Sequence, residues 1–164
     1  MSRRRVGRRA AAGSALFFAL APGVVAGLVP WLLTGWRSEP LPLVLRIAGG
    51  VLVAAGLAFL VHAFARFVTE GLGTPAPVAP TEALVIGGVY RWVRNPMYLA
   101  VGAVIAGQAL LLGRWVLIVW LAAFAVAVVA FVRLYEEPTL RDRYGATYDV
   151  YRRTVPGWWP RRPG

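Results

Sequence analysis

Two short polar clusters combine acids, bases and phenols at the ends of apolar runs. The first, RNPMY at residues 94–98, supplies a guanidinium, an amide and a phenol. The second, RLYEEP at residues 133–138, contains two adjacent carboxylates, Glu136 and Glu137. Adjacent carboxylates repel each other, so the pair favours a bound cation, a metal ion or hydroxyl donors. Ionisable groups that face inward at the end of a membrane helix typically mark a ligand site.

Each of these residues also has a simpler structural interpretation. Glu137 has Arg133 four residues before it and Arg141 four residues after it, which accounts for its charge on a helix surface. Tyr98 is typical of the aromatic belt of a membrane protein. The one histidine, His62, is more typical of a packing residue than of a general base.

The elements that must position these clusters are apolar helices. Hydrophobic residues make up 59% of the 164-residue chain, and they occur in long blocks. A membrane span needs about 20 apolar residues, and four blocks approach or exceed that length. We therefore predict an all-α, polytopic membrane protein with a single domain, residues 1–164, and four transmembrane helices. The expected spans are about 15–36, 43–68, 96–112 and 115–134.

The last two spans should form a tight hairpin because only Gly113 and Arg114 separate them. The hairpin would bring both polar clusters to the same membrane depth, one helix apart. All 18 basic residues are arginines. Their placement predicts that both termini are cytoplasmic in a bacterial-type inner membrane, with Arg37, Arg46 and Arg114 on the outer side.

Composition also excludes several classes of protein. Cysteine is absent and His62 is the only histidine, which excludes disulfides and multi-histidine or thiolate metal sites. The arginines stand at the ends of apolar blocks, so membrane lipids explain the net charge of +11 better than nucleic acid does. The N-terminus resembles a signal peptide, but its apolar run continues and three further spans follow, which argues against cleavage.

Two cytoplasmic segments remain, a loop at 69–95 and a tail at 138–164. Prolines in the loop favour an extended stretch, and the loop is a candidate lid over the polar clusters. In the tail, Tyr144, Tyr148 and Tyr151 have the spacing of one helical face. We therefore predict an amphipathic helix that lies on the inner leaflet.

The ordered motifs resemble those of the integral-membrane methyltransferases, which include isoprenylcysteine carboxyl methyltransferase and the phospholipid N-methyltransferases. The stretches that carry the resemblance are GGVYRWVRNPMYLA, a membrane hairpin, and LYEEPTLRDRYGATYDVYRRTVP. They span about half of the chain. The matching positions are Gly88, Tyr90, Arg91, Arg94, Pro96, Tyr98, Glu136 and Glu137. One departure is Asn95, which stands where the family has a histidine.

The resemblance implies S-adenosylmethionine as the cofactor, bound at the cytoplasmic end of the last two spans under the tail. Carboxylates would hold its ammonium or ribose hydroxyls, an arginine its carboxylate, and tyrosines its adenine or sulfonium. The implied cofactor-binding residues are Gly88, Tyr90, Arg94, Asn95, Pro96, Tyr98, Glu136, Glu137 and Tyr148. The implied catalytic residues are Asn95, Arg133 and Glu137, and no metal ion is expected.

The implied methyl acceptor is a lipophilic molecule presented from the inner leaflet. The tail resembles the isoprenylcysteine-type enzymes, which act on a carboxylate, and this is the leading interpretation. NPMY followed by LYEEP is closer to the phosphatidylethanolamine N-methyltransferases, which is the first alternative. Two further alternatives are a non-enzymatic membrane scaffold and a nicotinamide-dependent membrane reductase.

Overall fold

The computed structural model describes residues 20–71 and 84–161, except for the side chains of residues 67–71, and all regular elements in this part of the chain are helical. This confirms the all-α prediction. Residues 72–83, which include most of the candidate lid, lie outside the described part. The helices, including short π and 3₁₀ segments (η), are η1 (Val24–Leu28), α2 (Val29–Thr34), α3 (Leu43–Gly71), η2 (Gly88–Arg91), α4 (Pro96–Leu112), α5 (Val116–Phe131), η3 (Val132–Glu136), α6 (Glu137–Tyr144) and α7 (Ala146–Thr154).

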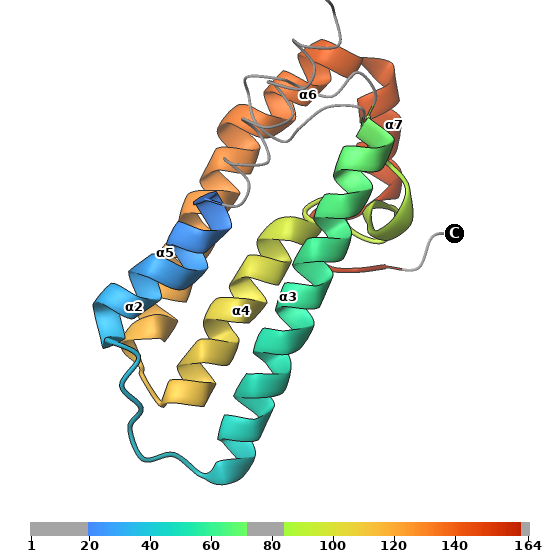
Figure 1. Cartoon of the computed structure of the whole chain (residues 1–164). Coiled ribbons are helices and arrows are strands. Elements are labelled where there is room, and N and C mark those ends of the chain that lie inside the picture. Colours follow the sequence, from blue (N-terminus) through green and yellow to red (C-terminus); the bar gives the residue numbers. More distant parts are fainter. Residues whose placement is uncertain (1–19, 72–83, 162–164) are drawn as a thin grey trace, which may run out of the picture.

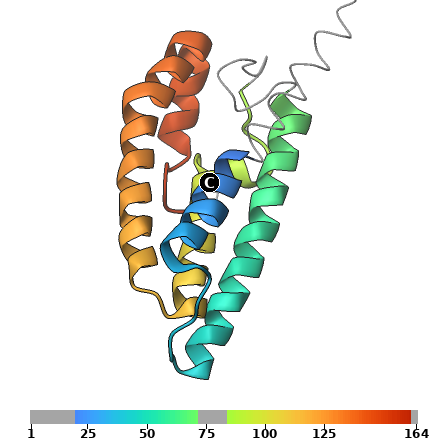
Figure 2. The same cartoon turned by 60° about the vertical axis from the view of Figure 1, so that its left-hand side comes forward.

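Helices α3 and α4 lie side by side along their length, and α5 runs back beside α4 (Figure 1). The segment from η1 to α2 contacts both α4 and α5 (Figure 2). The predicted hairpin is present, because Gly113 ends α4 in the left-handed conformation that favours glycine, with φ 67°. Both polar clusters therefore lie toward the same end of the molecule.

Glycines allow the backbones of α3 and α4 to approach closely. A Cβ atom on Gly49 would lie 2.5 Å from the backbone N of Leu111 and 2.6 Å from the carbonyl O of Gly107. A Cβ atom on Gly107 would lie 2.8 Å from the carbonyl O of Gly49. In lipid, helices associate without a hydrophobic driving force, and small residues favour association because they allow close van der Waals packing of the two backbones. This close packing against α3 holds α4 in place, and with it the RNPMY motif at the start of α4.

A proline and a π-helical turn in the first apolar helix leave two carbonyl groups without their usual donors. Pro30 has no N–H for the carbonyl of Ala26, and the N–H of Val29 bonds to Val24 instead of Val25. Side chains from the hairpin replace both donors. Gln108 Nε2 donates to the Ala26 oxygen at 2.6 Å, and Trp120 Nε1 donates to the Val25 oxygen at 2.9 Å.

Replacing Trp120 by phenylalanine should therefore reduce stability, because the Val25 carbonyl loses its donor in an apolar environment. The expected loss in the free energy of unfolding is about 1–2 kcal/mol. Trp115→Phe is the matched control, since Trp115 is 74% exposed and its side chain makes no described hydrogen bond; it should change stability by less than about 0.5 kcal/mol. Equal losses in the two variants, measured by denaturant unfolding in bicelles, would contradict this account.

Two helices are long and apolar enough to cross a membrane, Leu43–Arg66 and Val116–Tyr144, and two more, Leu20–Thr34 and Pro96–Leu112, are shorter. The four-span topology and its orientation stay predictions. Residues 15–19 of the first expected span lie outside the described part. The fourth helix continues ten residues beyond its expected end at 134. Pro138 does not stop it; the π-helical turn η3 comes directly before, and Pro138 is the second residue after that turn.

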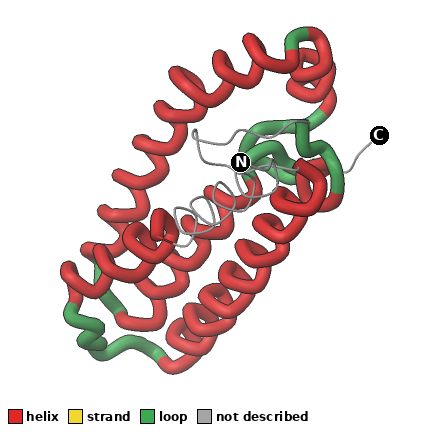
Figure 3. Tube along the Cα trace, turned by 45° about the horizontal axis from the view of Figure 1, so that its top comes forward, coloured by secondary structure: helices red, strands yellow, loops and turns green. Residues whose placement is uncertain are grey.

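The tail forms two short helices rather than the single helix expected at 138–164. Gly145 separates α6 from α7, with φ 52° and ψ −128°, a conformation that glycine adopts readily. The prediction that the three tail tyrosines share one helical face is therefore wrong. They still come together, because Tyr148 and Tyr151 of α7 are buried with Val155, and Tyr144 packs against them (Figure 3 shows the turn). The expected loop at 69–95 contains the end of α3 and the short helix η2.

Candidate active site

The start of α4 is held in place by the turn before it. Gly88 opens the 3₁₀ segment η2 with φ 54°, and a Cβ atom there would lie 3.2 Å from Arg66 Nε. Pro96 occupies the first turn of α4, and its lack of an N–H removes one unpaired donor from the helix start. Asn95 is the N-cap residue and is buried. Arg94 therefore lies directly before the start of α4, where its side chain contacts the tail.

Arg94 is the centre of a cluster that joins α4 to the tail. Its Nη1 atom lies 2.8 Å from Glu137 Oε1 and donates to the Tyr148 hydroxyl at 3.1 Å. The second oxygen of Glu137 lies 3.2 Å from Arg152 Nη2. The side chains of Arg94 and Glu137 are only 14% and 16% exposed, so solvent screens this pair weakly.

The structure corrects the simpler interpretation of Glu137. Its partners are Arg94 and Arg152, from other elements, and not Arg133 and Arg141 of the same helix. Arg141 pairs with Asp149 at 2.9 Å instead. The π-helical turn η3, which ends at Glu136, changes the helical phase before Glu137. The spacing of an ideal helix therefore fails between Arg133 and Glu137, whereas Arg141 follows this turn and is taken by Asp149.

The neighbouring carboxylate has a different environment. Glu136 Oε2 accepts a hydrogen bond from the Tyr98 hydroxyl at 3.0 Å, and no described residue forms an ion pair with Glu136. Tyr98 lies on the first turn of α4, so this bond is a second link between α4 and the EEP motif. The two adjacent carboxylates are thus not equivalent: Glu137 is held by two guanidinium groups, and Glu136 by one phenol.

Burial raises the pKa of two phenols of the tail. It raises the pKa of Tyr148 above its usual value, and the nearby Arg94 only partly opposes this. Burial likewise raises the pKa of Tyr151. The Tyr151 hydroxyl donates to the backbone oxygen of Tyr90 at 2.7 Å, and Tyr90 is itself buried. These groups therefore act at neutral pH as hydrogen-bonding phenols and not as phenolates.

Two polar atoms in the cluster retain hydrogen-bonding capacity. Arg94 Nε is buried and has no partner among the described residues. Glu136 uses Oε2 for Tyr98, and its other carboxylate oxygen has no described hydrogen bond. The cluster thus offers a cationic donor and an anionic acceptor close together. The described residues contain no group of three or more acidic, histidine or cysteine side chains that could hold a metal ion.

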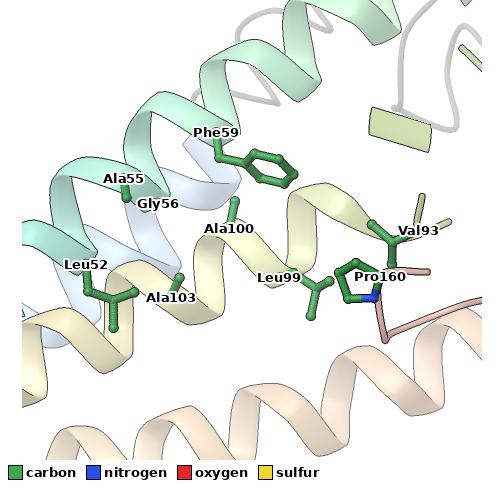
Figure 4. A pocket seen from close by; sticks show the side chains of 9 residues that line it. All are labelled: Leu52, Ala55, Gly56, Phe59, Val93, Leu99, Ala100, Ala103 and Pro160. Atoms are coloured by element: carbon green, nitrogen blue, oxygen red, sulfur yellow. The ribbon is translucent and has the colours of Figure 1, made fainter. Parts of the chain in front are cut away.

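An apolar pocket of about 350 Å³ adjoins this cluster on the α3–α4 pair (Figure 4). Two of its lining residues stand next to polar residues in the sequence: Val93 precedes Arg94, and Pro160 precedes Arg161. The full lining is Leu52, Ala55, Gly56, Phe59, Val93, Leu99, Ala100, Ala103 and Pro160. One end of the pocket therefore lies next to the charged residues, and the rest follows the apolar helices.

The α4–α5 hairpin thus carries NPMY and EEP side by side at the same end. A family model described as phospholipid methyltransferase matches residues 44–147. The chain belongs to the phospholipid methyltransferase family. The phospholipid methyltransferase match includes both polar motifs and ends before Tyr148, Arg152 and the C-terminal segment. No curated protein and no solved structure matches the chain.

For this phospholipid methyltransferase family member, the structure brings together most of the expected site residues. The cluster contains Arg94, Tyr98, Glu136, Glu137 and Tyr148. Asn95 and Pro96 adjoin it, whereas Gly88 and Tyr90 support the turn behind it. The functional roles of these residues stay predictions.

One expected catalytic residue lies apart, and two contributors were not expected. Arg133 is exposed and makes none of the contacts of the cluster. Arg152 and Gly157 were missed by sequence reasoning. The signal for Arg152 is its position four residues after Tyr148 on a helix, which places both on one face. Gly157 gives no signal beyond following the Val-Pro pair.

Proposed function

We propose that this protein transfers a methyl group from S-adenosylmethionine to a lipophilic acceptor in the inner leaflet, with the EEP end of the hairpin and both termini on the cytoplasmic side. The observation that carries the proposal is the pair of unused polar atoms, Arg94 Nε and the second oxygen of Glu136, in one partly buried cluster. The methionine end of the cofactor carries a carboxylate and an ammonium. A guanidinium donor and a carboxylate acceptor are complementary to those two groups.

The residues would divide the work as follows. Glu136 would accept hydrogen bonds from the ammonium or the ribose hydroxyls, and Arg94 would donate to the carboxylate. Tyr98 and Tyr148 would orient Glu136 and Arg94 through the bonds that they already make. When bound, the cofactor supplies an electrophilic methyl group on a sulfonium. The chain would contribute chiefly by aligning the two reactants and excluding water.

Two classes of acceptor are each favoured by one observation. The family match favours a phospholipid amine. A carboxylate, as in isoprenylcysteine, is favoured because the nearby carboxylates are already in use: Glu136 would hold the cofactor and Glu137 is paired twice, while His62 is exposed on α3. A carboxylate needs no deprotonation before methyl transfer, whereas an ammonium does. In both cases the apolar pocket beside Val93 would hold part of the hydrocarbon chain.

Titration of S-adenosylmethionine into protein in lipid nanodiscs tests this proposal. Wild-type protein should show saturable binding, and Glu136→Gln should weaken it at least tenfold, because a neutral amide loses the charge that favours the ammonium. Glu39→Gln is the matched control, since Glu39 pairs with Arg114 at the opposite end of the hairpin. Labelled-methyl transfer to phosphatidylethanolamine or to a prenylated cysteine would then identify the acceptor class.

Two outcomes would reject the proposal. Folded wild-type protein that binds no S-adenosylmethionine in any lipid composition would leave a scaffold as the better account. Saturable binding of a reduced nicotinamide dinucleotide, with no binding of S-adenosylmethionine, would favour a membrane reductase.

A further inference from the structure

The C-terminal segment, residues 155–161, runs across the start of α4 and is held there by three hydrogen bonds. The Arg94 backbone N–H donates to the Pro156 oxygen at 2.9 Å, and the Arg161 N–H donates to the Trp92 oxygen at 3.1 Å. The third bond is the only one from a side chain: Asn95 Nδ2 donates to the Gly157 oxygen at 3.1 Å. This segment lies beyond the part that the family model matches.

The Asn95 side chain does not cap α4, the helix that begins after it. An asparagine at an N-cap normally accepts a hydrogen bond from an N–H group of the first turn. Asn95 is the N-cap of α4 and makes no such bond. Its side chain is buried, with the residue 6% exposed, and its amide is committed to the tail instead.

The partner position is shaped for this contact. A Cβ atom on Gly157 would lie 3.2 Å from Arg94 Nη2 and 3.7 Å from Asn95 Nδ2. Glycine therefore lets the backbone press directly against the guanidinium and the amide. Three residues further on, Pro160 lines the apolar pocket together with Val93. One short segment thus contacts the polar cluster and the apolar pocket at the same time.

We infer that Asn95 is a positioning residue that fixes the C-terminal segment as the common wall of the polar cluster and the apolar pocket. This inference rests on the proposed function, because the wall matters only if the cluster binds a methyl donor and the pocket a lipophilic acceptor. Its chemistry requires an N–H donor at position 95, and no proton is transferred. Histidine at this position retains such a donor when its imidazole is neutral.

The absence of cysteine from the chain allows a direct test of segment docking. A single Val155→Cys substitution places a thiol where the valine is 9% exposed, in the cluster against which Leu84 and Leu140 pack. The rate of its maleimide labelling in nanodiscs reports undocking of the segment. Val150→Cys, at a position 54% exposed on α7, gives the reference rate for an accessible thiol.

Asn95→Leu removes the donor at nearly constant volume and should raise labelling of the Val155→Cys thiol about tenfold. Asn95→His at pH 8 should restore protection, and the affinity for S-adenosylmethionine should follow the same order. Gln108→Leu is the matched control. It also removes a side-chain amide, but one that donates to the Ala26 carbonyl and not to the C-terminal segment, so it should leave labelling unchanged. If Asn95→Leu does not fold, Gly157→Ala tests docking from the tail side, because its Cβ would lie 3.2 Å from the Arg94 guanidinium, which Glu137 and Tyr148 hold in place.

Unchanged protection in Asn95→Leu, or in Gly157→Ala, would overturn the inference. So would a failure of Asn95→His to restore protection. These results are independent of the proposed function, since labelling is measured without cofactor. Wild-type protein with a protected Val155→Cys thiol that binds no S-adenosylmethionine would instead reject the proposed function and leave the docking role standing.

Discussion

Replacing Gly49 by alanine is expected to destabilise the protein by about 3 kcal/mol or more, because the added methyl group meets backbone atoms. Its Cβ would lie 2.5 Å from the Leu111 nitrogen and 2.6 Å from the Gly107 oxygen. A flexible side chain could rotate away, but the backbone of a helix cannot move without separating α3 from α4. The free energy of unfolding in bicelles measures the effect.

The adjacent glycine provides a matched control. A Cβ on Gly50 would meet only Leu111 Cδ1, at 3.9 Å, which is an ordinary contact. Gly50→Ala should therefore be neutral or slightly stabilising, because alanine favours a helix over glycine by about 1 kcal/mol. Similar losses from Gly49→Ala and Gly50→Ala would show that close packing of the two backbones does not determine stability here.

Arg94→Gln should have the largest effect on the candidate site. It leaves Glu137 with a single cationic partner, Arg152, and removes the donor to Tyr148. Breaking a largely buried pair from one side costs about 3 kcal/mol, because the remaining charge stays desolvated. We expect the affinity for S-adenosylmethionine to fall about a hundredfold and the C-terminal segment to dock less firmly. Isothermal titration in nanodiscs measures the first effect.

Two further variants separate charge from geometry. Arg94→Lys keeps the charge but has no planar fork to contact Glu137 and Tyr148 together, so it should recover little of the lost affinity. Arg143→Gln removes a cation from an exposed position on α6, where its guanidinium lies over the Tyr144 ring, and should leave affinity unchanged. Equal losses in Arg94→Gln and Arg143→Gln would mean that net charge, and not the Arg94 contacts, supports binding.

Local signals in the sequence were sufficient for the hairpin and for much of the site. The bounds expected for α4 agree with those observed, because Pro96 and Gly113 mark its two ends by their backbone preferences. That hairpin brings RNPMY near EEP, as expected, whereas the individual pairs, Arg94 with Glu137 and Tyr98 with Glu136, come from the structure. The family match over residues 44–147 agrees with the resemblance carried by these motifs.

Other features depend on contacts that no local pattern encodes. The partners of Glu137 differ from those expected, because a π-helical turn changes the spacing to Arg133 and because Arg141 pairs with Asp149 of α7 instead. The tail divides at Gly145, although the spacing of its tyrosines is that of one helix. Gln108 and Trp120 donate to carbonyls more than eighty residues away, which only the folded chain reveals.

The long helix from α5 to α6 buries little of its apolar middle against the rest of the described chain. Leu117 is buried near its start and Val132 just before the EEP motif, whereas no residue between them is buried. In a bilayer, the middle of such a rod is wetted by lipid chains. For the proposed reaction, the acceptor then finds the polar cluster by a two-dimensional search within one leaflet. The concentration that governs the rate is the mole fraction of acceptor in the bilayer, and not its amount per volume of buffer.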